Sequence, residues 1–436
     1  MTGPRNANLR IMARAVLRPV WPTDRRLYAL ALFGCTLVLV GTAFFIIVLA
    51  LNWGPDFRHV LDFTAFWAAA SMTLNGQPSL AYDWEAHRAV EEAALGGSFT
   101  GVMPWHYPPV FQVLVTPFGL LPPFAAHAFW VILTLSFYLG VVNRIMPGRT
   151  PLLAAMIPAP FLMLVVNGQT GFLIAALIGL TLLNLDRRPV AAGVALGFAA
   201  LKPHLVIAFP IALAATGKWR MLAVSALTIA ALAGVSILLL GAGTWVAFFD
   251  SLGHTATVFT DSGNKWHLYA SLYGRLRLAG FDLIPAVGAQ AVLSVGTMWF
   301  LVCGMRSPSM APDVQAALIA YASIAIAPRV LDYDILTLYI GALFQIRHAR
   351  SAGFFPGEML VLGLALAVTF ADLLLPHDTG LFLSDMNFLL APLLMAALLA
   401  GEKRREAETA REPATGMQAA DAREPASDLQ AGHGVG

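Results

Sequence analysis

Apolar runs of roughly 15 to 25 residues recur along nearly the whole chain, and they constrain its fold more than any other feature. Only 12% of the residues are charged, about half the fraction that is usual in a soluble domain. A segment inside lipid must satisfy its own backbone hydrogen bonds, so it is either a helix or part of a closed barrel. Long Leu, Ala and Val runs without alternation exclude the barrel. The sequence therefore predicts an all-α polytopic membrane protein.

The two ends of the chain differ from the rest. Residues 1–26 carry six arginines and no apolar segment, which favours a cytoplasmic anchor over a cleavable signal. After Gly401 the chain becomes polar and contains a near repeat, AREPATGMQA followed by AREPASDLQA. This composition predicts a disordered cytoplasmic tail over residues 401–436. Residues 27–400 are left as the transmembrane domain.

Basic clusters between the apolar runs set the expected topology. If every cluster is cytoplasmic, each interval between clusters contains an even number of crossings. The clusters are Arg5 to Arg26, Arg144 with Arg149, Arg187 with Arg188, Lys218 with Arg220, Arg306, Arg347 with Arg350, and Lys403 to Arg405. The expected spans are 27–51, 124–143, 151–166, 171–185, 189–203, 205–216, 221–241, 283–304, 313–328, 334–346, 357–375 and 385–400. This gives about twelve spans with both termini in the cytoplasm.

Residues 53–123 form the largest expected segment outside the membrane. Within it, YPPVFQVLVTPFGLLPP (107–123) is apolar but has too few residues between its proline pairs to cross comfortably. Counting it as a span would also place Arg187 and Arg188 outside. We interpret it as a re-entrant or interfacial helix that belongs to the first outer loop.

Polar residues near membrane depth are costly, so those that remain are functional candidates. In this topology nearly all of them lie on the outer side, whereas the cytoplasmic ends carry scattered basic residues. They are Asp56, Arg58, His59, Asp62, His106, Tyr107, Asn167, Gln169, Lys202, His204, Lys265, Trp266, His267, Ser271, Arg275, Arg277, Arg329, Asp332 and Asp334. This one-sided distribution predicts a single site on the outer face.

The residue types in this set fit the transfer of a sugar from a lipid phosphate. Lys and Arg bind phosphate, Arg in bidentate fashion, and aromatic rings such as that of Trp67 stack on sugars. Asp62 is the candidate base, with Asp56 as a rival; a helix N-cap or an ion pair with Arg58 is the structural alternative. No nucleotide-binding glycine loop is present, so the expected donor is a lipid.

Five stretches of the chain resemble the bacterial GT-C membrane glycosyltransferases, specifically glycosyltransferase family 87, of the polyprenyl-phosphate-mannose-dependent α-mannosyltransferase type. They are DFTAFWAAASMTLNGQPSLAYD, YPPVFQVLVTPFGLLP, NGQTGFLIAALIGLTLL, RRPVAAGVALGFAALKPHL and PRVLDYDIL. The resemblance implies a GT-C fold, a first-loop aspartate as catalytic base, matched by Asp62, and a lysine near the lipid phosphate, matched by Lys202. Arg329 occupies a position that varies among typical members.

We therefore expect an inverting hexosyltransferase that moves a sugar, expected to be mannose, from a polyprenyl phosphate to a lipid or glycan acceptor. Asp62 is the expected catalytic residue. The expected phosphate ligands are Lys202, His204 and Arg329. The expected substrate contacts are Trp67, His106, Tyr107, Gln169, Trp266, Asp332 and Asp334. The alternatives are a secondary transporter, because about twelve spans is also a transporter count, and a lipid-linked glycan ligase or flippase.

The expected partners are the donor lipid, the acceptor and membrane lipids, with no nucleic acid. The expected location is a bacterial inner membrane, with the site on the extracytoplasmic face. Cys35 and Cys303 both fall in apolar runs, so they suggest neither a disulfide framework nor a metal site. No cofactor is expected, and participation of a divalent ion stays open.

Overall fold

The computed structural model describes Thr36 and residues 62–99, 103–261, 266, 269–355, 357–374 and 387–421. Within these ranges the chain consists of helices and connections, with one isolated antiparallel bridge between Tyr269 and Leu331. The N-terminal segment 1–26 and the first outer-loop residues, with Asp56 and Arg58, lie outside the described residues. So do Lys265, His267 and, apart from Thr36, the expected span 27–51.

Three of the described helices are long and apolar enough to cross a membrane: α6 (Pro123–Ile145), α12 (Trp219–Leu240) and α15 (Leu283–Met305). Each coincides with one expected span. The other helices over expected spans are α7 (Arg149–Ala154), α8 (Ala159–Asn167), α9 (Gly171–Leu183), α10 (Pro189–Ala199), α11 (Ala208–Ala215), α16 (Pro312–Ile326), α17 (Leu336–Ala352), α18 (Glu358–Leu374) and α19 (Asn387–Asp421). The chain is thus an all-helical membrane protein, and the count of about twelve spans stays a prediction.

Two helical regions differ from the expected pattern for local reasons. The expected span 151–166 is divided into α7 and α8 before Pro158, because the residue preceding a proline is disfavoured in helical geometry. Residues 242–261, which lie between two expected spans, form helix α13 (Ala242–Asp261). Its outward-facing residues Val246 and Phe249 are 59% exposed, so this helix presents an apolar surface to its surroundings.

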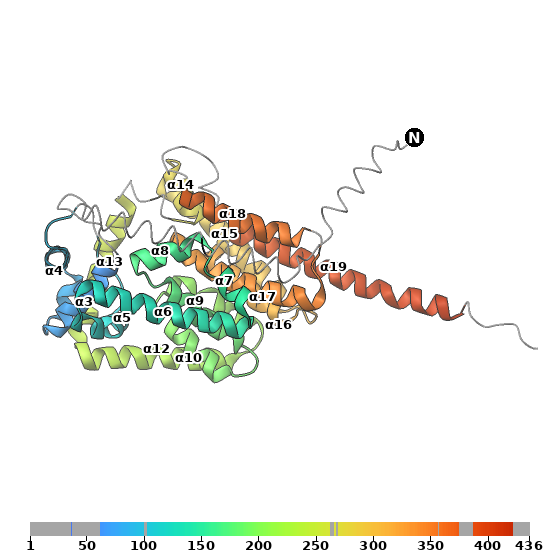
Figure 1. Cartoon of the computed structure of the whole chain (residues 1–436), viewed down its shortest axis with the longest axis horizontal. Helices are drawn as coiled ribbons and strands as arrows, with labels where there is room; N and C mark the ends of the chain where they lie inside the picture. Colours follow the sequence, from blue (N-terminus) through green and yellow to red (C-terminus); the bar gives the residue numbers. More distant parts are fainter. Residues whose placement is uncertain are drawn as a thin grey trace, which may run out of the picture.

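Residues 62–120, within the segment expected to be the first outer loop, fold into short helices around an aromatic cluster. Its elements are α3 (Phe63–Leu74), η1 (Pro78–Tyr82), α4 (Trp84–Leu95), α5 (Pro109–Val115) and η2 (Thr116–Leu120), so the 107–123 segment is a short helix followed by a 3-10 turn. The Phe66 ring meets the rings of Tyr107 and Phe111 edge-on, at centroid separations of 5.3 and 5.1 Å. Edge-to-face pairs of this kind add to the stabilisation from burial alone. They fix the 103–108 segment against α3 at the end of the molecule that carries α3, α4, α5 and α13 (Figure 1).

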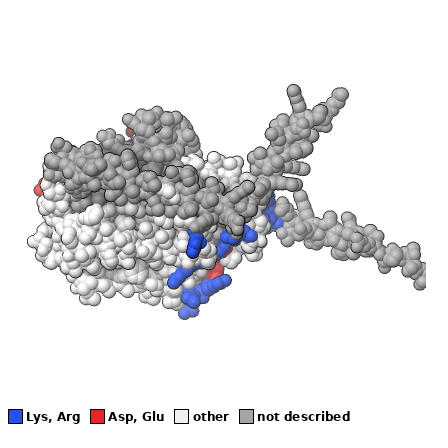
Figure 2. Space-filling view, viewed as in Figure 1, with Lys and Arg blue, Asp and Glu red and all other residues white. Residues whose placement is uncertain are grey.

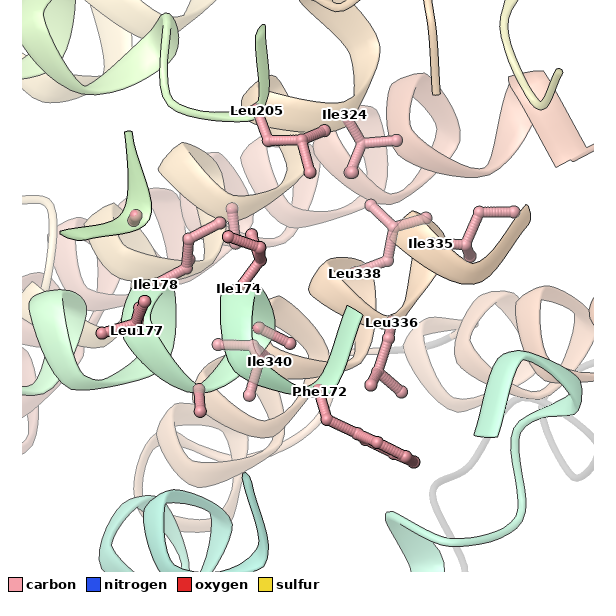
Figure 3. Close-up of a cluster of buried hydrophobic side chains, with 14 of the residues drawn as sticks. Phe172, Ile174, Leu177, Ile178, Leu205, Ile324, Ile335, Leu336, Leu338 and Ile340 are labelled. Carbon is pink, nitrogen blue, oxygen red and sulfur yellow. The ribbon is translucent and has the colours of Figure 1, made fainter. Parts of the chain in front are cut away.

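The core packs α9 against α16 and α17 (Figure 3). Lipid tails are as apolar as leucine, so close packing of small residues contributes strongly to helix association in membranes. Ala317 and Ala320 of α16 are fully buried, and a Cβ added to Gly341 of α17 would lie 2.6 Å from the Tyr321 ring. Leu205, which follows Lys202 by three residues, and Ile335 belong to the same buried cluster. The core therefore fixes the segments that carry Lys202 and Asp334.

Helix α19 continues through residues that were expected to form a disordered tail. It extends to Asp421 and projects away from the rest of the molecule (Figure 1). Near its middle, Glu402 approaches His348 at 3.0 Å and Arg405 approaches Glu358 at 3.2 Å. These contacts connect α19 with α17 and α18 and support helical structure beyond Gly401. Residues 422–436 lie outside the described part.

Basic residues gather at one end of the helices. Figure 2 shows Lys and Arg in one region of the visible face, while most of the remaining described surface has neither charge. Arg187 and Arg188 precede α10, Lys218 and Arg220 flank the start of α12, and Arg306 follows α15. The exposed basic residues that flank these three helices therefore lie at one end, whereas Lys202, after the other end of α10, is buried in the ion pair with Asp334.

Candidate active site

A cavity of about 810 Å³ lies where helix ends meet the short helices of residues 62–120. Its walls come from the start of α3, the 103–108 segment, the α8–α9 turn, the connection after α10, and the segment 328–334. Nine of the eleven predicted site residues line it: Asp62, His106, Tyr107, Gln169, Lys202, His204, Arg329, Asp332 and Asp334. Residues from five separate parts of the sequence are thus brought to one place.

Asp62 is oriented by a chain of two hydrogen bonds. Gln169 Nε2 donates to Asp62 Oδ2 at 2.9 Å, and the Tyr107 hydroxyl donates to Gln169 Oε1 at 3.0 Å. An amide donates only through nitrogen and accepts only through oxygen, so Tyr107 fixes which way the Gln169 amide faces. Asp62 precedes α3 but makes no side-chain capping bond to it, so the structure does not support the N-cap interpretation. Gln169 lines the cavity and donates a hydrogen bond to the Asp62 carboxylate.

The NGQTG turn holds Gln169 in place. Helix α8 ends at Asn167, and Gly168 follows with φ of +67°, a conformation that glycine adopts without a Cβ penalty. A Cβ at Gly168 would lie 2.6 Å from the His127 ring and 2.8 Å from Phe63 Cβ, so side chains pack directly onto this backbone. The close approach fixes the turn against α3, and this sets the Gln169 to Asp62 distance.

Lys202 and Asp334 form a buried ion pair. Lys202 Nζ lies 2.7 Å from Asp334 Oδ1, and the two residues are 5% and 2% exposed. The ammonium also lies 4.7 Å from the centre of the Tyr333 ring, and Asp334 Oδ2 accepts a hydrogen bond from the Leu331 backbone at 3.2 Å. With its ammonium held by Asp334, Lys202 contributes positive charge to the wall of the cavity.

His106 is held as a neutral imidazole. Its Nδ1 lies 3.0 Å from the Pro104 carbonyl oxygen, which can only accept, so Nδ1 carries the proton and Nε2 is the acceptor nitrogen. Burial, together with the nearby charges of Lys202 and Arg329, lowers the pKa of His106 to about 4. A neutral histidine with a defined tautomer can accept a hydrogen bond in the cavity at neutral pH.

His204 and Arg329 are the more accessible cationic or basic groups of the cavity, because both are half-buried whereas Lys202 is buried. The backbone around Arg329 is fixed by the segment before α14 (Leu272–Leu278). The Ser271 hydroxyl donates to the Pro328 carbonyl at 2.6 Å, and the Ala270 amide donates to the Val330 carbonyl at 2.8 Å. Arg329 is thus a half-buried cation on a backbone that is held by two hydrogen bonds.

One side of the cavity is apolar, and the sequence analysis did not identify it. Helices α12 and α13 supply this wall, whose residues are Ile229, Leu232, Ala233, Trp245, Phe248 and Leu252. This wall was not predicted because no span or helix was expected between residues 241 and 283. The signal was the run of aromatic and aliphatic residues in TWVAFFDSLG. A polar floor beside an apolar wall suits an amphiphilic ligand.

Two predicted substrate contacts lie elsewhere. Trp67 Nε1 donates to the Leu121 carbonyl at 2.8 Å and so joins α3 to the end of η2. Trp266 is 4% exposed, packs against Tyr269 and Tyr273, and has the Arg277 guanidinium 5.0 Å from its ring centre. Neither tryptophan lines the cavity, so the structure gives no support to sugar stacking on them.

The described residues contain no cluster of three His, Cys, Asp or Glu side chains placed to hold a metal ion.

Comparison with protein families gives a match to the model of glycosyltransferase family 87 over residues 105–331. This range is about half of the chain and contains His106, Tyr107, Gln169, Lys202, His204 and Arg329, while Asp62 and Asp334 lie outside it.

Searches of curated proteins and of solved structures give no significant match. The family match spans the cavity-lining segments from the 103–108 loop to Leu331, in an all-helical chain with span-length apolar helices. The chain belongs to glycosyltransferase family 87, and it is a membrane glycosyltransferase.

Proposed function

We propose that the chain transfers a hexose, with mannose as the first candidate, from a polyprenyl-phosphate donor to a hydroxyl of a lipid or glycan acceptor, with inversion. The observation that carries this proposal is the cavity itself. An oriented carboxylate, Asp62, and a cationic region with Arg329 and Lys202 share one cavity with the neutral imidazole of His204, whose pKa burial lowers to about 4, and the cavity also has an apolar wall. In a sugar joined to a lipid through a phosphate, the reacting sugar would lie near the carboxylate and the phosphate near the cationic region. The apolar wall suits the lipid or acceptor part of the reactants.

In this mechanism Asp62 accepts the proton of the acceptor hydroxyl while the acceptor oxygen bonds to the anomeric carbon. The bond from that carbon to the phosphate oxygen breaks, and the lipid phosphate leaves with the bonding electrons. Arg329 and His204 stabilise the leaving phosphate, and Lys202 contributes charge from the cavity wall. A phosphate is a good leaving group, so no second carboxylic acid is required, unlike in a glycosidase.

The placement of charge supports an extracytoplasmic site. The end of α10 and the C-terminal half of α12 line the cavity, while the basic residues flank the starts of these helices. Similarly, α17 begins just after Asp334 and carries Arg347 and Arg350 near its end. Lys and Arg flanking membrane helices favour the cytoplasm. The cavity then opens on the opposite face, where a polyprenyl-linked sugar is a suitable donor because no nucleotide is required.

Membership of a glycosyltransferase family favours this reaction over secondary transport.

The test is sugar transfer in purified membranes. Polyprenyl-phosphate-linked mannose, then glucose and arabinose, are offered to the wild type and to Asp62→Asn, with total lipid extract as the acceptor. We expect the wild type to consume one donor and Asp62→Asn to lose at least about 100-fold in rate. The control is Asp83→Asn, because Asp83 lies on the same outer loop and only caps α4.

Near-normal transfer by folded Asp62→Asn would exclude Asp62 as the base. If the wild type consumed none of these donors with lipid extract or with cell-wall polysaccharide as the acceptor, the proposed donor class would be wrong.

A further inference from the structure

A second groove borders the cavity at Arg329. It has a volume of about 360 Å³ and lies between α14 and α15, with Tyr273, Leu283, Val287, Ala291 and Pro328 among its lining residues. Arg329 lines both this groove and the main cavity, so the two spaces meet at its side chain. The mechanism above assigns no role to this groove.

The polar side chains in the groove are already bonded to the protein. Gln290 Oε1 accepts from the Tyr273 backbone at 3.2 Å, and Gln290 Nε2 donates to the Ala325 carbonyl at 3.1 Å. The Ser294 hydroxyl donates to the Ile326 carbonyl at 2.9 Å. These bonds satisfy the two side chains, so the surface offered to a ligand is mainly carbon, apart from Arg329 at one end.

The outer rim of the groove carries exposed apolar side chains on a helix that is long enough to cross a membrane. Leu283 and Val287 are 44% and 49% exposed, and α15 is one of the three helices of span length. The exposed face of α15 continues with Val295 and Trp299, which are 65% and 68% exposed. A chain lying in the groove can therefore pass along apolar protein surface into the lipid.

Arg329 and Asp62 are held by different elements. Asp62 is bonded to the α8–α9 turn, whereas the segment of Arg329 is bonded to the residues before α14. In an inverting displacement the attacking and leaving oxygens lie on opposite faces of the sugar carbon. The leaving phosphate and its lipid are then expected on the Arg329 side, and the groove is on that side.

Building on the proposed function, we infer that the isoprenoid chain of the donor lies in the groove between α14 and α15, with its phosphate at Arg329. The groove fits an isoprenoid phosphate because its apolar surface is open to lipid and one cation, Arg329, lies at its inner end. The apolar wall of α12 and α13 is left for the acceptor.

The test compares two donors that carry the same sugar phosphate, one on a long polyprenyl chain and one on a single isoprene unit. Ala291→Trp fills the groove. The matched control is Ala128→Trp, an exposed alanine on the span-length helix α6. We expect Ala291→Trp to raise KM for the long-chain donor by at least about tenfold and to leave the short-chain donor unchanged. Val287→Trp is a second, independent block, and elution of each purified variant as a single species in detergent checks its fold.

Equal effects of Ala291→Trp on both donors, or no effect on either, would overturn the inference while leaving the proposed function standing. The same holds if Leu232→Trp, in the α12 wall, selectively impaired the long-chain donor, because the chain would then lie there. If the wild type transferred from neither donor, the proposed function itself would fail, and the inference with it.

Discussion

Replacing Asp334 by asparagine tests whether the buried pair with Lys202 holds the cavity together. At the observed 2.7 Å and an effective dielectric constant of about 20, the Coulomb attraction is about 6 kcal/mol. Desolvation of two buried ions offsets part of this, but removing one partner leaves the other charge buried and unpaired. We therefore expect Asp334→Asn to lower the free energy of unfolding by about 3 to 5 kcal/mol. Asparagine keeps an oxygen for the Leu331 amide, so the loss reports mainly on the charge.

A double-mutant cycle with Lys202→Met isolates the pair. The measurement is loss of helical signal during SDS titration in mixed micelles. We expect the double variant to be less destabilised than the sum of the single variants, by at least about 2 kcal/mol. The control pair is Lys218 with Asp186, which lies at 2.6 Å but is 24% and 44% exposed at its side chains. Lys218→Met is expected to cost under about 1 kcal/mol.

Two results would contradict this reasoning. Additive effects of Lys202→Met and Asp334→Asn, with a coupling below about 0.5 kcal/mol, would mean that the two charges do not stabilise each other. Equal losses at the buried and the exposed pair would mean that burial does not decide the magnitude.

Three further predictions concern the cavity. Gln169→Leu removes a hydrogen bond to a charged group, so kcat should fall about 10- to 100-fold with donor KM unchanged, and an unchanged kcat in steady-state assays would contradict this. Gly168→Ala should destabilise the protein more than Gly217→Ala in the same SDS titration, because both glycines have φ near +67° but only Gly168 has atoms within 3 Å of an added Cβ. Burial lowers the pKa of His106 to about 4 from an ordinary value of 6.5, so the unfolded state binds the proton more readily. The stability that His106 contributes should therefore be present above about pH 6.5 and decline towards pH 4, and His106→Phe should weaken this decline in thermal unfolding across that range.

Local properties of the sequence predicted the helices well where an apolar run was long. The predicted span 124–143 corresponds to α6 (Pro123–Ile145), and 283–304 corresponds to α15 (Leu283–Met305). Run length, flanking prolines and flanking basic residues are properties of neighbouring residues, so they can be read without knowledge of the fold. No span or helix was expected at α13, between two predicted spans, and α19 continues through residues 401–421, where Glu402 and Arg405 contact α17 and α18.

For the cavity, the sequence indicated which residues take part and the tertiary structure showed how they are paired. Sequence alone identified the polar residues that remain among apolar helices, because their cost in a membrane marks them wherever they fold. Only the tertiary structure decided their partners. Lys202 and Asp334 are 132 residues apart, and Asp62 and Gln169 are 107 apart. It also placed Trp67 and Trp266 away from the cavity and α13 in its wall. Such pairings depend on how helices distant in the sequence pack together, and no local pattern of residues encodes that choice.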